Sequence, residues 1–236
     1  MAEKYNNILA VIPARGGSKR IPGKNVRMFS GKPLIYYTIR FAQLQKRINK
    51  IVISTDDYEI KDIAEKLGVE VIIRPKELAT DFTPSADVIK HVLIELYKKN
   101  IYFDLVVTLQ VTNPLRPENL FLNCLKQFEN NLKSNCLISI SKNILKLGTI
   151  KNGFFNPANY SLGQRSQDLL PNYFENGLIY ISHSNSILNE NSIISGNILP
   201  YIVDHQFPIV DIDEEIDFVY GEFLFNKNIE LFNYLL

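Results

Sequence analysis

The chain has 236 residues, a formal net charge of +1, 46% hydrophobic residues and 22% charged residues. This composition is typical of a soluble globular protein, and its nearly balanced charge argues against a broad basic face for nucleic acid. Because no apolar run approaches the roughly 18–20 residues of a membrane span, we expect a cytoplasmic protein without membrane or nucleic-acid partners, folded as a single domain over residues 1–236.

Apolar runs rich in β-branched residues predict the strands. They are Ile8–Ile12, Ile51–Ser54, Val69–Ile73, Leu105–Leu109, Leu137–Ile140, Leu178–Ser182 and a final run at Ile209–Ile212. The first five are nearly continuous rather than alternating, which indicates burial on both faces. Helical patterns lie between them at Pro33–Lys46, Tyr58–Leu67, Pro84–Lys99 and Pro117–Asn130, and another helix follows the final run. This alternation predicts an α/β fold, a mostly parallel sheet with helices on both faces.

The helix over Pro84–Lys99 has the clearest pattern. Thr83 can cap it, and Pro84 suits the first helical position. After about residue 140 the regular alternation of strands and helices gives way to shorter pieces. Residues 140–190 are therefore set apart as an excursion from the regular sheet.

The loop after the first predicted strand reads VIPARGGSKRIPGKN and carries several anion-seeking groups. Ligands of open α/β sheets lie beyond the carboxyl ends of the strands, and the first such loop commonly holds phosphate. Gly16 and Gly17 let backbone N–H groups approach a phosphate closely. Positive charge is added by Arg15, Lys19, Arg20 and Lys24. We therefore predict a bound polyphosphate, with a flexible surface loop of solvated cations as the alternative.

This loop does not match a Walker A loop, which requires the pattern G-x4-G-K-[ST]. Gly17 and Gly23 enclose five residues, and Lys24 is followed by Asn25 rather than by a hydroxyl residue. Pro22 also removes one N–H donor. The expected polyphosphate site is therefore of a different kind.

Several separate stretches resemble the cytidine-monophosphate sugar-acid synthetases, especially the acylneuraminate cytidylyltransferases. PARGGSKRIPGKN is similar to the N-terminal motif of that family, and the later stretches follow in the family's order: ISTDDYEI, IRPKELATD, LQVTNPLR, RSQDLLPNYFENGLIYI and IVDIDEEIDF. The resemblance covers nearly the whole chain. It implies a Rossmann-like nucleotidyltransferase fold. It also implies transfer of CMP from CTP to the anomeric hydroxyl of a nonulosonic acid, with release of pyrophosphate, for cell-surface glycan synthesis.

On the nucleotide side, the resemblance implies that Arg15, Ser18 and Lys19 contact the triphosphate of CTP. It further implies that ribose and cytosine are recognised by Asn25, Arg74 and Ser85. Arg74 ends a strand before Pro75, where a solvated arginine is the alternative. Ser85 lies in the first turn of a helix and could instead satisfy backbone donors there.

On the acceptor side, the resemblance assigns the sugar acid to Gln110, Thr112, Lys146, Arg165, Gln167 and Asn176. The family often reads Gln-Pro-Thr-Ser-Pro where this chain has Gln110-Val111-Thr112-Asn113-Pro114. In relatives an arginine commonly precedes the glutamine at which this chain has Ser166, and Arg165 stands one residue earlier. A guanidinium suits the acceptor because it can hold the sugar carboxylate through two hydrogen bonds. The alternatives are that Thr112 and Asn113 are turn residues and that Lys146 is a solvated lysine.

The excursion over residues 140–190 corresponds, by resemblance, to a segment that reaches a second subunit, so we expect a homodimer. Its aromatic residues offer interface material: Phe154, Phe155, Tyr160, Tyr173 and Phe174. The alternative is that these side chains close the chain's own core.

Asp211 and Asp213 come at the end of the final apolar run. Residues two apart on a strand point to the same side, so both carboxylates can address one Mg²⁺, which completes its shell with water and phosphate oxygens. The alternative is that Asp213 caps the helix starting at Glu214 and that Asp211 is a turn acid.

The predicted mechanism is an in-line attack of the anomeric hydroxyl on the α-phosphorus of CTP. Asp211 and Asp213 would hold Mg²⁺ on the phosphates, and Lys19 and Arg15 would stabilise the leaving pyrophosphate. No general base stands out, and the histidines are read as structural or solvated: His91, His183 and His205.

Sialic, legionaminic and pseudaminic acids remain open as acceptors. The competing functions are a synthetase for the eight-carbon acid Kdo, another sugar nucleotidyltransferase, and a nucleotide-binding protein without catalysis.

Overall fold

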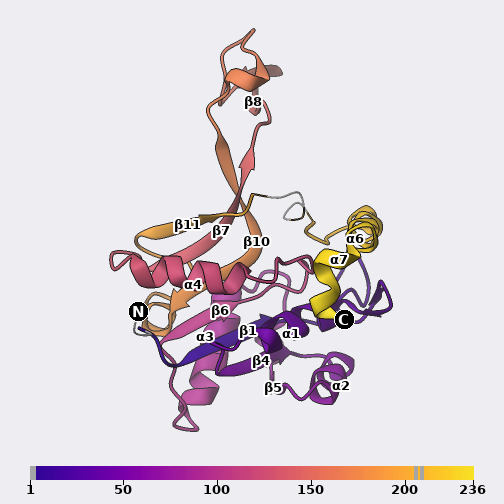
Figure 1. Ribbon diagram of the computed structural model, residues 1–236, viewed down its shortest axis with the longest axis vertical. Coiled ribbons are helices and arrows are strands. Elements are labelled where there is room, and N and C mark those ends of the chain that lie inside the picture. The colour runs from indigo at the N-terminus through magenta and orange to yellow at the C-terminus, as the bar shows by residue number, and fades with distance from the viewer. Residues whose placement is uncertain (1–3, 205–206, 208–209) are drawn as a thin grey trace.

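A computed structural model describes residues 4–204, 207 and 210–236 of the chain. At its centre is a seven-stranded sheet in the order β11-β7-β10-β6-β1-β4-β5 (Figure 1). Its strands are β1 (Ile8–Pro13), β4 (Lys50–Thr55), β5 (Glu70–Ile73), β6 (Leu105–Thr108), β7 (Cys136–Asn143), β10 (Asn172–His183) and β11 (Ile198–Ile202). All run parallel except β10, which pairs antiparallel with β6 and β7. The predicted mostly parallel sheet is confirmed.

Helices cover both faces of the sheet because successive residues of each buried strand point to opposite faces. In β1, Ile8, Ala10 and Ile12 pack into one hydrophobic core, whereas Leu9 and Val11 pack into a second. The first core is covered by α1 (Leu34–Leu44), α2 (Tyr58–Lys66), α4 (Leu120–Asn130), α6 (Glu215–Lys227) and α7 (Ile229–Phe232). The second is covered by α3 (Ser85–Tyr97) and α5 (Ser184–Glu190). No helix among the described residues is both long and apolar enough to cross a membrane.

The strand predicted at Ile209–Ile212 is wrong for the part that the structure describes, and Ile209 lies outside the described residues. The backbone over 210–212 bonds to the loop after β6 instead of to a strand: Ile212 N donates to Thr112 O at 2.8 Å. The seventh strand is β11, an edge strand whose exposed Ile198 and Ile202 and central Pro200 give it no strong strand pattern.

Two helix starts differ from the expected caps. Pro84, not Thr83, is the N-cap of α3, and the Thr83 hydroxyl lies 2.8 Å from that of Thr80 instead. Glu214 is the N-cap of α6 and forms a capping box with Asp217. The alternative in which Asp213 caps this helix is therefore wrong, and its carboxylate is left for other partners.

An aromatic cluster holds α6 against the hairpin that follows the first loop. This hairpin is β2 (Met28–Phe29) and β3 (Lys32–Pro33). Phe225 of α6 lies 5.1 Å from Tyr37 and 5.9 Å from Phe29, between ring centroids. A Cβ at Gly221 would lie 3.0 Å from Val210 Cγ1, so a glycine lets α6 approach the segment before Asp211 closely. The packing of α6 therefore sets where residues 210–213 lie.

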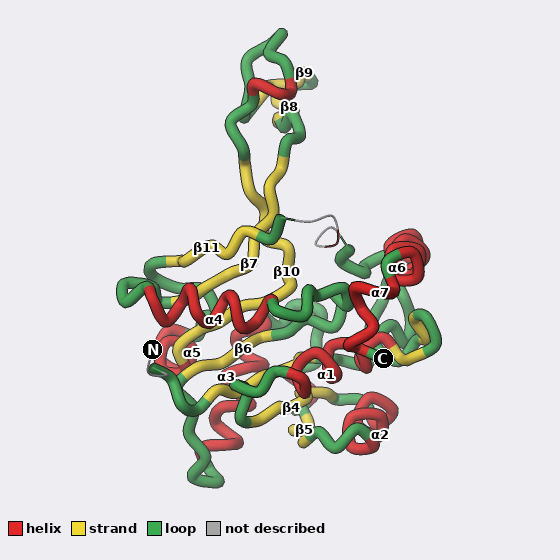
Figure 2. The backbone as a smooth tube through the Cα atoms, viewed as in Figure 1, coloured by secondary structure: helices red, strands yellow, loops and turns green. Residues whose placement is uncertain are grey.

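Between β7 and β10 the chain leaves the sheet and projects from one end of it (Figure 2). This projecting segment, residues 144–171, carries the hairpin of β8 (Gly148–Lys151) and β9 (Phe154–Pro157). Its apolar side chains are largely exposed, including Ile150 at 77%, Phe154 at 76% and Leu170 at 83%. The alternative in which the aromatic residues close the chain's own core is therefore wrong for Phe154 and Phe155, which is 55% exposed.

The packing of α6 predicts a contrast between two phenylalanines on this helix. Phe225→Ala should lower the free energy of unfolding by about 3–5 kcal/mol, because Phe225 is buried within the aromatic cluster. Phe223→Ala, on the exposed face of the same helix, should cost less than about 1 kcal/mol. Urea denaturation followed by circular dichroism measures both, and equal losses would contradict the assigned packing.

Candidate active site

A cleft of 710 Å³ lies where loops follow the carboxyl ends of β1, β5 and β6 and meet residues 211–213. Most of the site residues predicted from the sequence line it, namely Arg15, Ser18, Lys19, Lys24, Asn25, Arg74, Ser85, Gln110, Thr112, Asp211 and Asp213. Parallel strands place their carboxyl ends along one edge, which is why segments far apart in the chain meet there.

The loop after β1 is folded against the start of α2. Gly16 N donates to Asp56 Oδ1 at 3.1 Å, and a Cβ on Gly16 would lie 2.5 Å from Asp57 Oδ2. Glycine is therefore needed here for the close approach, and its N–H group is engaged by a carboxylate. Gly17 has no neighbour within 4 Å of a would-be Cβ. Asn25 Nδ2 donates to Arg15 O at 2.8 Å and so closes the loop.

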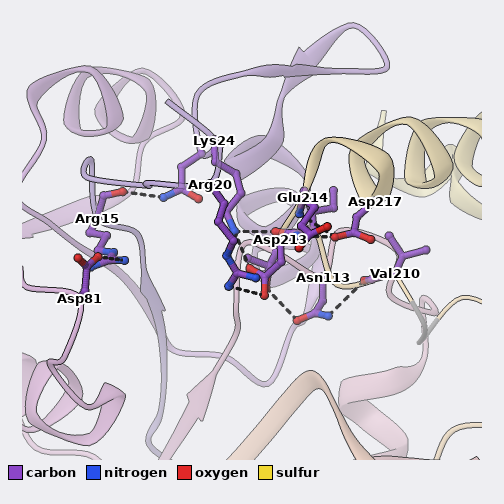
Figure 3. Close-up of polar contacts among 12 residues, drawn as sticks. Arg15, Arg20, Lys24, Asp81, Asn113, Val210, Asp213, Glu214 and Asp217 are labelled. Atoms are coloured by element: carbon purple, nitrogen blue, oxygen red, sulfur yellow. Dashed lines mark hydrogen bonds and ion pairs between the residues drawn. The ribbon is translucent and has the colours of Figure 1, made fainter. Parts of the chain in front are cut away.

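Asp81 forms ion pairs with two of the loop cations. Arg15 Nη2 lies 2.6 Å from Asp81 Oδ1 (Figure 3). Lys19 Nζ pairs with Asp81 Oδ2. The hydrogen bond from Lys19, followed by that from Arg15, lowers the pKa of Asp81 below its usual value. The sequence prediction missed this residue although it stands in the stretch IRPKELATD. The one feature of the sequence that could have indicated Asp81 is its place, as a carboxylate in the loop that follows a strand bordering the site.

The other two cations of the loop contact Asp213, one of the two candidate metal ligands. Lys24 Nζ donates to Ile212 O at 2.6 Å and to Asp213 Oδ1 at 3.1 Å. Arg20 Nη2 donates to Asp213 Oδ2 at 2.9 Å. The Lys24 side chain is only 11% exposed, so this is a partly buried junction rather than a loose surface pair. These contacts bring the first loop and the aspartate pair to the same cleft.

Asp211 and Asp213 both face the cleft, and the intervening Ile212 is fully buried. The two carboxylates thus share a side although no strand carries them. Burial raises the pKa of Asp211, and the nearby Asp213 carboxylate raises it further. A hydrogen bond with the Thr112 hydroxyl lowers this pKa. Among the residues described, no cluster of three or more His, Cys, Asp or Glu is placed to hold a metal. Two hard carboxylates beside the cationic loop fit Mg²⁺, which needs only one or two protein carboxylates.

Arg74 and the loop before α3 form the opposite wall. Arg74 is 6% exposed, and its Nη2 donates to Ser54 O at 2.9 Å, so the solvated alternative is wrong. Burial lowers the pKa of its guanidinium. Ser85 is the first residue of α3 and lines the cleft. Phe82, which the sequence prediction did not single out, also lines the cleft and is 94% exposed.

The floor on the side of Gln110 depends on a buried cation. Arg116 is fully buried, and it donates to Gln110 O at 2.5 Å, Leu178 O at 2.8 Å and Thr38 Oγ1 at 3.0 Å. Burial lowers the pKa of Arg116 to about 9. Gly177 has a φ of +73°, and a Cβ there would lie 2.7 Å from Gln110 Oε1. Glycine at this point therefore lets β10 pass directly beneath the glutamine side chain.

Four predicted sugar residues do not line this cleft: Lys146, Arg165, Gln167 and Asn176. The first three lie in the projecting segment and are exposed. Arg165 pairs with Asp168 through two contacts of 2.7 and 3.0 Å, and Lys146 donates to Gln164 O. Asn176 is 3% exposed and lies under the floor.

The described histidines lie away from the cleft lining. His91 is on α3, and His183 packs beside the rings of Tyr5 and Phe128. Burial lowers the pKa of both. His205, predicted to be structural or solvated, lies outside the described residues.

Comparison with known proteins decides the family. The model of a family described as cytidylyltransferase matches residues 9–220. The chain belongs to this cytidylyltransferase family. It is 34% identical over 230 residues to the CMP-N,N'-diacetyllegionaminic acid synthase of Legionella pneumophila, covering 94% of this chain and 98% of that protein.

Two further comparisons concern a second sequence relative of this cytidylyltransferase and a solved structure. It is 32% identical over 219 residues to the N-acylneuraminate cytidylyltransferase of Escherichia coli, covering 89% of this chain and 50% of that protein, so it spans about half of that relative's length. A solved CMP:2-keto-3-deoxy-manno-octonic acid synthetase complexed with CTP matches with a TM-score of 0.72 at 17% identity, covering 94% of this chain and 99% of that one. At this identity the likeness shows the fold alone, and it agrees with the Rossmann-like nucleotidyltransferase fold expected from the sequence.

The pairing of Asp81 predicts an effect on anion binding. Asp81→Asn should tighten the binding of inorganic tripolyphosphate to this cytidylyltransferase about threefold, because Arg15 and Lys19 lose a competing carboxylate. Isothermal titration calorimetry at low ionic strength measures the change. Asp62→Asn removes the same charge from an exposed pair with Lys66 on α2 and should leave the affinity unchanged. Weaker binding by Asp81→Asn would contradict a competing role.

Proposed function

We propose that this cytidylyltransferase transfers CMP from CTP to the anomeric hydroxyl of a nonulosonic acid of the sialic, legionaminic or pseudaminic type and releases pyrophosphate. The observation that carries the proposal is the junction of Lys24 and Arg20 with Asp213, since it brings the polyphosphate loop and the carboxylate pair to one cleft. The identities to proteins named for legionaminic and neuraminic acids support the choice of acceptor.

CTP lies across the carboxyl ends of the strands, with its triphosphate along the loop after β1. Arg15 offers a planar fork to phosphate oxygens, and Lys19 offers a mobile point charge. Both side chains must break their ion pairs with Asp81 in order to contact phosphate. Ser18, Lys24 and Asn25 complete the loop, while Arg74 and Ser85 face the ribose and cytosine across the cleft.

Asp211 and Asp213 are the residues that hold Mg²⁺. When bound, the ion neutralises charge on the phosphates and favours ionisation of a hydroxyl near it. Lys24, fixed on Ile212 O, keeps the backbone of this segment against the loop. Arg20 and Lys24 also balance the Asp213 carboxylate in the protein without nucleotide.

The transfer step is a displacement in line at the α-phosphorus. Gln110 and Thr112 hold the sugar at the end of β6 so that its anomeric oxygen faces the phosphorus. The anomeric oxygen bonds to the α-phosphorus, and its proton passes to water. The bond from the α-phosphorus to the bridging oxygen breaks, and pyrophosphate leaves toward Arg15 and Lys19. These cations stabilise the charge that develops on it.

The projecting segment makes the active unit a homodimer. Its exposed apolar side chains need a partner surface, and Lys146, Arg165 and Gln167 lie on it rather than at the cleft of their own chain. In the dimer, the segment of one copy lies at the partner's cleft. Arg165 then exchanges Asp168 for the carboxylate of the sugar acid.

The reaction takes place in the cytoplasm, and its product serves as a CMP-sugar donor for cell-surface glycans.

The direct test is pyrophosphate release from CTP with a panel of sialic, legionaminic and pseudaminic acids, with Kdo as the competing acceptor. Turnover with Kdo alone would reject the nonulosonic assignment. No turnover with any acid would favour a protein that only binds nucleotide.

The metal assignment predicts the behaviour of one variant. Asp213→Ala should abolish pyrophosphate release in the presence of magnesium, with a fall of at least about a thousandfold in kcat, while the circular dichroism spectrum stays that of the folded protein. Glu230→Ala, a carboxylate on α7 that does not line the cleft, is the control and should keep full turnover. Retained turnover by Asp213→Ala would remove the metal assignment.

The dimer assignment predicts how Arg165 behaves. Arg165→Ala should raise the KM for the acceptor acid at least about tenfold and leave the KM for CTP nearly unchanged, because only the acid loses a charged partner.

Mixing subunits tests which cleft Arg165 serves. Because each variant alone lacks one essential group, a mixed dimer of Arg165→Ala and Asp213→Ala chains should regain one intact site and hence activity at low acid concentration. The reverse KM pattern, or no recovery after subunit exchange, would contradict the proposal.

A further inference from the structure

Asn113 lies between the acceptor side and the metal side of the cleft, and none of its surface is exposed. Its amide nitrogen Nδ2 donates to Asn176 O at 3.1 Å and to Val210 O at 3.2 Å. Asn176 belongs to β10, and Val210 directly precedes Asp211. Figure 3 shows the second of these bonds beside Asp213. The Asn113 amide group therefore joins β10 to the segment that carries the candidate metal ligands.

This bridge requires an amide at position 113. An Asn amide nitrogen has two hydrogens, and here each has its own carbonyl acceptor. The Oδ1 atom accepts from Thr112 Oγ1 at 3.3 Å. A serine, the residue that the resembling motif often has here, is shorter and has one donor. Gly177 leaves the space, since a Cβ there would lie 2.7 Å from Asn113 Oδ1.

The acceptor end of the bridge is itself held by buried hydrogen bonds. Asn176 Oδ1 accepts from Ser139 Oγ at 2.6 Å, and Asn176 Nδ2 donates to Ser141 Oγ at 3.0 Å. Both serines belong to β7, which forms the stem of the projecting segment together with β10. A buried polar network with its partners satisfied is rigid, so Asn176, to which Asn113 bonds, has a well-defined position.

The metal end of the bridge lacks the support of a strand. Residues 210–213 belong to no sheet, and their position depends on a few specific contacts. Besides the bond from Asn113, they include those from Ile212 N to Thr112 O at 2.8 Å, from Lys24 Nζ to Ile212 O at 2.6 Å and from Asp213 N to Asp217 Oδ2 at 3.0 Å. The bond to Val210 O links this segment through Asn113 to β10.

We propose that Asn113 is a positioning residue that sets the place of Asp211 relative to β10, the strand beneath Gln110, without touching substrate itself. The inference rests on the proposed function, because it takes Asp211 as a metal ligand and the loop after β6 as the side that holds the sugar. It predicts that loss of one of the two amide bonds weakens metal binding and slows transfer, while CTP still binds through the loop after β1.

The test is Asn113→Ser in the full chain. Mn²⁺ binding to the CTP-saturated protein, without acceptor, is followed by enhancement of water proton relaxation. We expect the Mn²⁺ dissociation constant to rise about tenfold and kcat to fall by a similar factor, because residues that orient metal ligands have effects of this size. At saturating metal the KM for CTP should stay within about twofold of the unchanged protein.

Gln45→Leu is the matched control. Gln45 is also a buried amide, and its Nε2 donates to Phe41 O at 3.1 Å and to Glu118 O at 3.5 Å, away from the cleft. This variant should lose stability in thermal unfolding but keep the Mn²⁺ affinity and kcat of the unchanged protein.

Wild-type Mn²⁺ affinity and kcat in Asn113→Ser would overturn the inference, and so would equal losses in Gln45→Leu. If Asn113→Ser does not fold, Asn113→Thr takes its place. Failure of both to fold, while Gln45→Leu folds, would assign Asn113 a purely structural role and overturn it as well. An unchanged protein that neither turns over CTP nor binds Mn²⁺ would reject the proposed function, and this inference with it.

Discussion

The site depends on the contact of Lys24 with Ile212 O and Asp213, because it joins the first loop of the chain to a segment 188 residues later. Four loop cations without nearby anions would repel one another and stay solvated. Here each pair of cations has a carboxylate, Asp81 for Arg15 and Lys19 and Asp213 for Arg20 and Lys24. Two carboxylates face four cations, so the loop keeps a net positive charge, and all four cations are already held in ion pairs.

The acceptor side is built by a different kind of interaction. Arg116, Asn113 and Asn176 are buried polar residues that hydrogen-bond mainly to backbone carbonyls and to serine and threonine hydroxyls. Each is costly to bury unless its partners are in place, so together they specify one arrangement of the loop after β6 against β10. The glycine at 177 completes this arrangement because any side chain there would enter the space of Gln110 and Asn113.

The sequence predicted the sheet well where strands are covered on both faces, because continuous apolar runs such as that of β1 have no other stable place. The prediction of strands failed for two segments that are not covered on both faces. The apolar run before Asp211 bonds to a loop, and β11 is an edge strand with Ile198 and Ile202 exposed. Helix caps were misplaced by one residue at α3 and α6, since capping depends on side-chain contacts that a pattern does not show.

For the site, the sequence by itself determined the chemistry: a cationic loop after the first strand, a carboxylate pair near the end, and a resemblance that joins them in one family. Tertiary structure decided which groups meet. Asp81 faces Arg15 across the cleft, Asn113 reaches both Asn176 and Val210, and Arg165 lies on the projecting segment next to Asp168. The physical reason is that hydrogen bonds and ion pairs need a particular distance and direction, and only the packing of α6 and β10 on the rest of the fold supplies these.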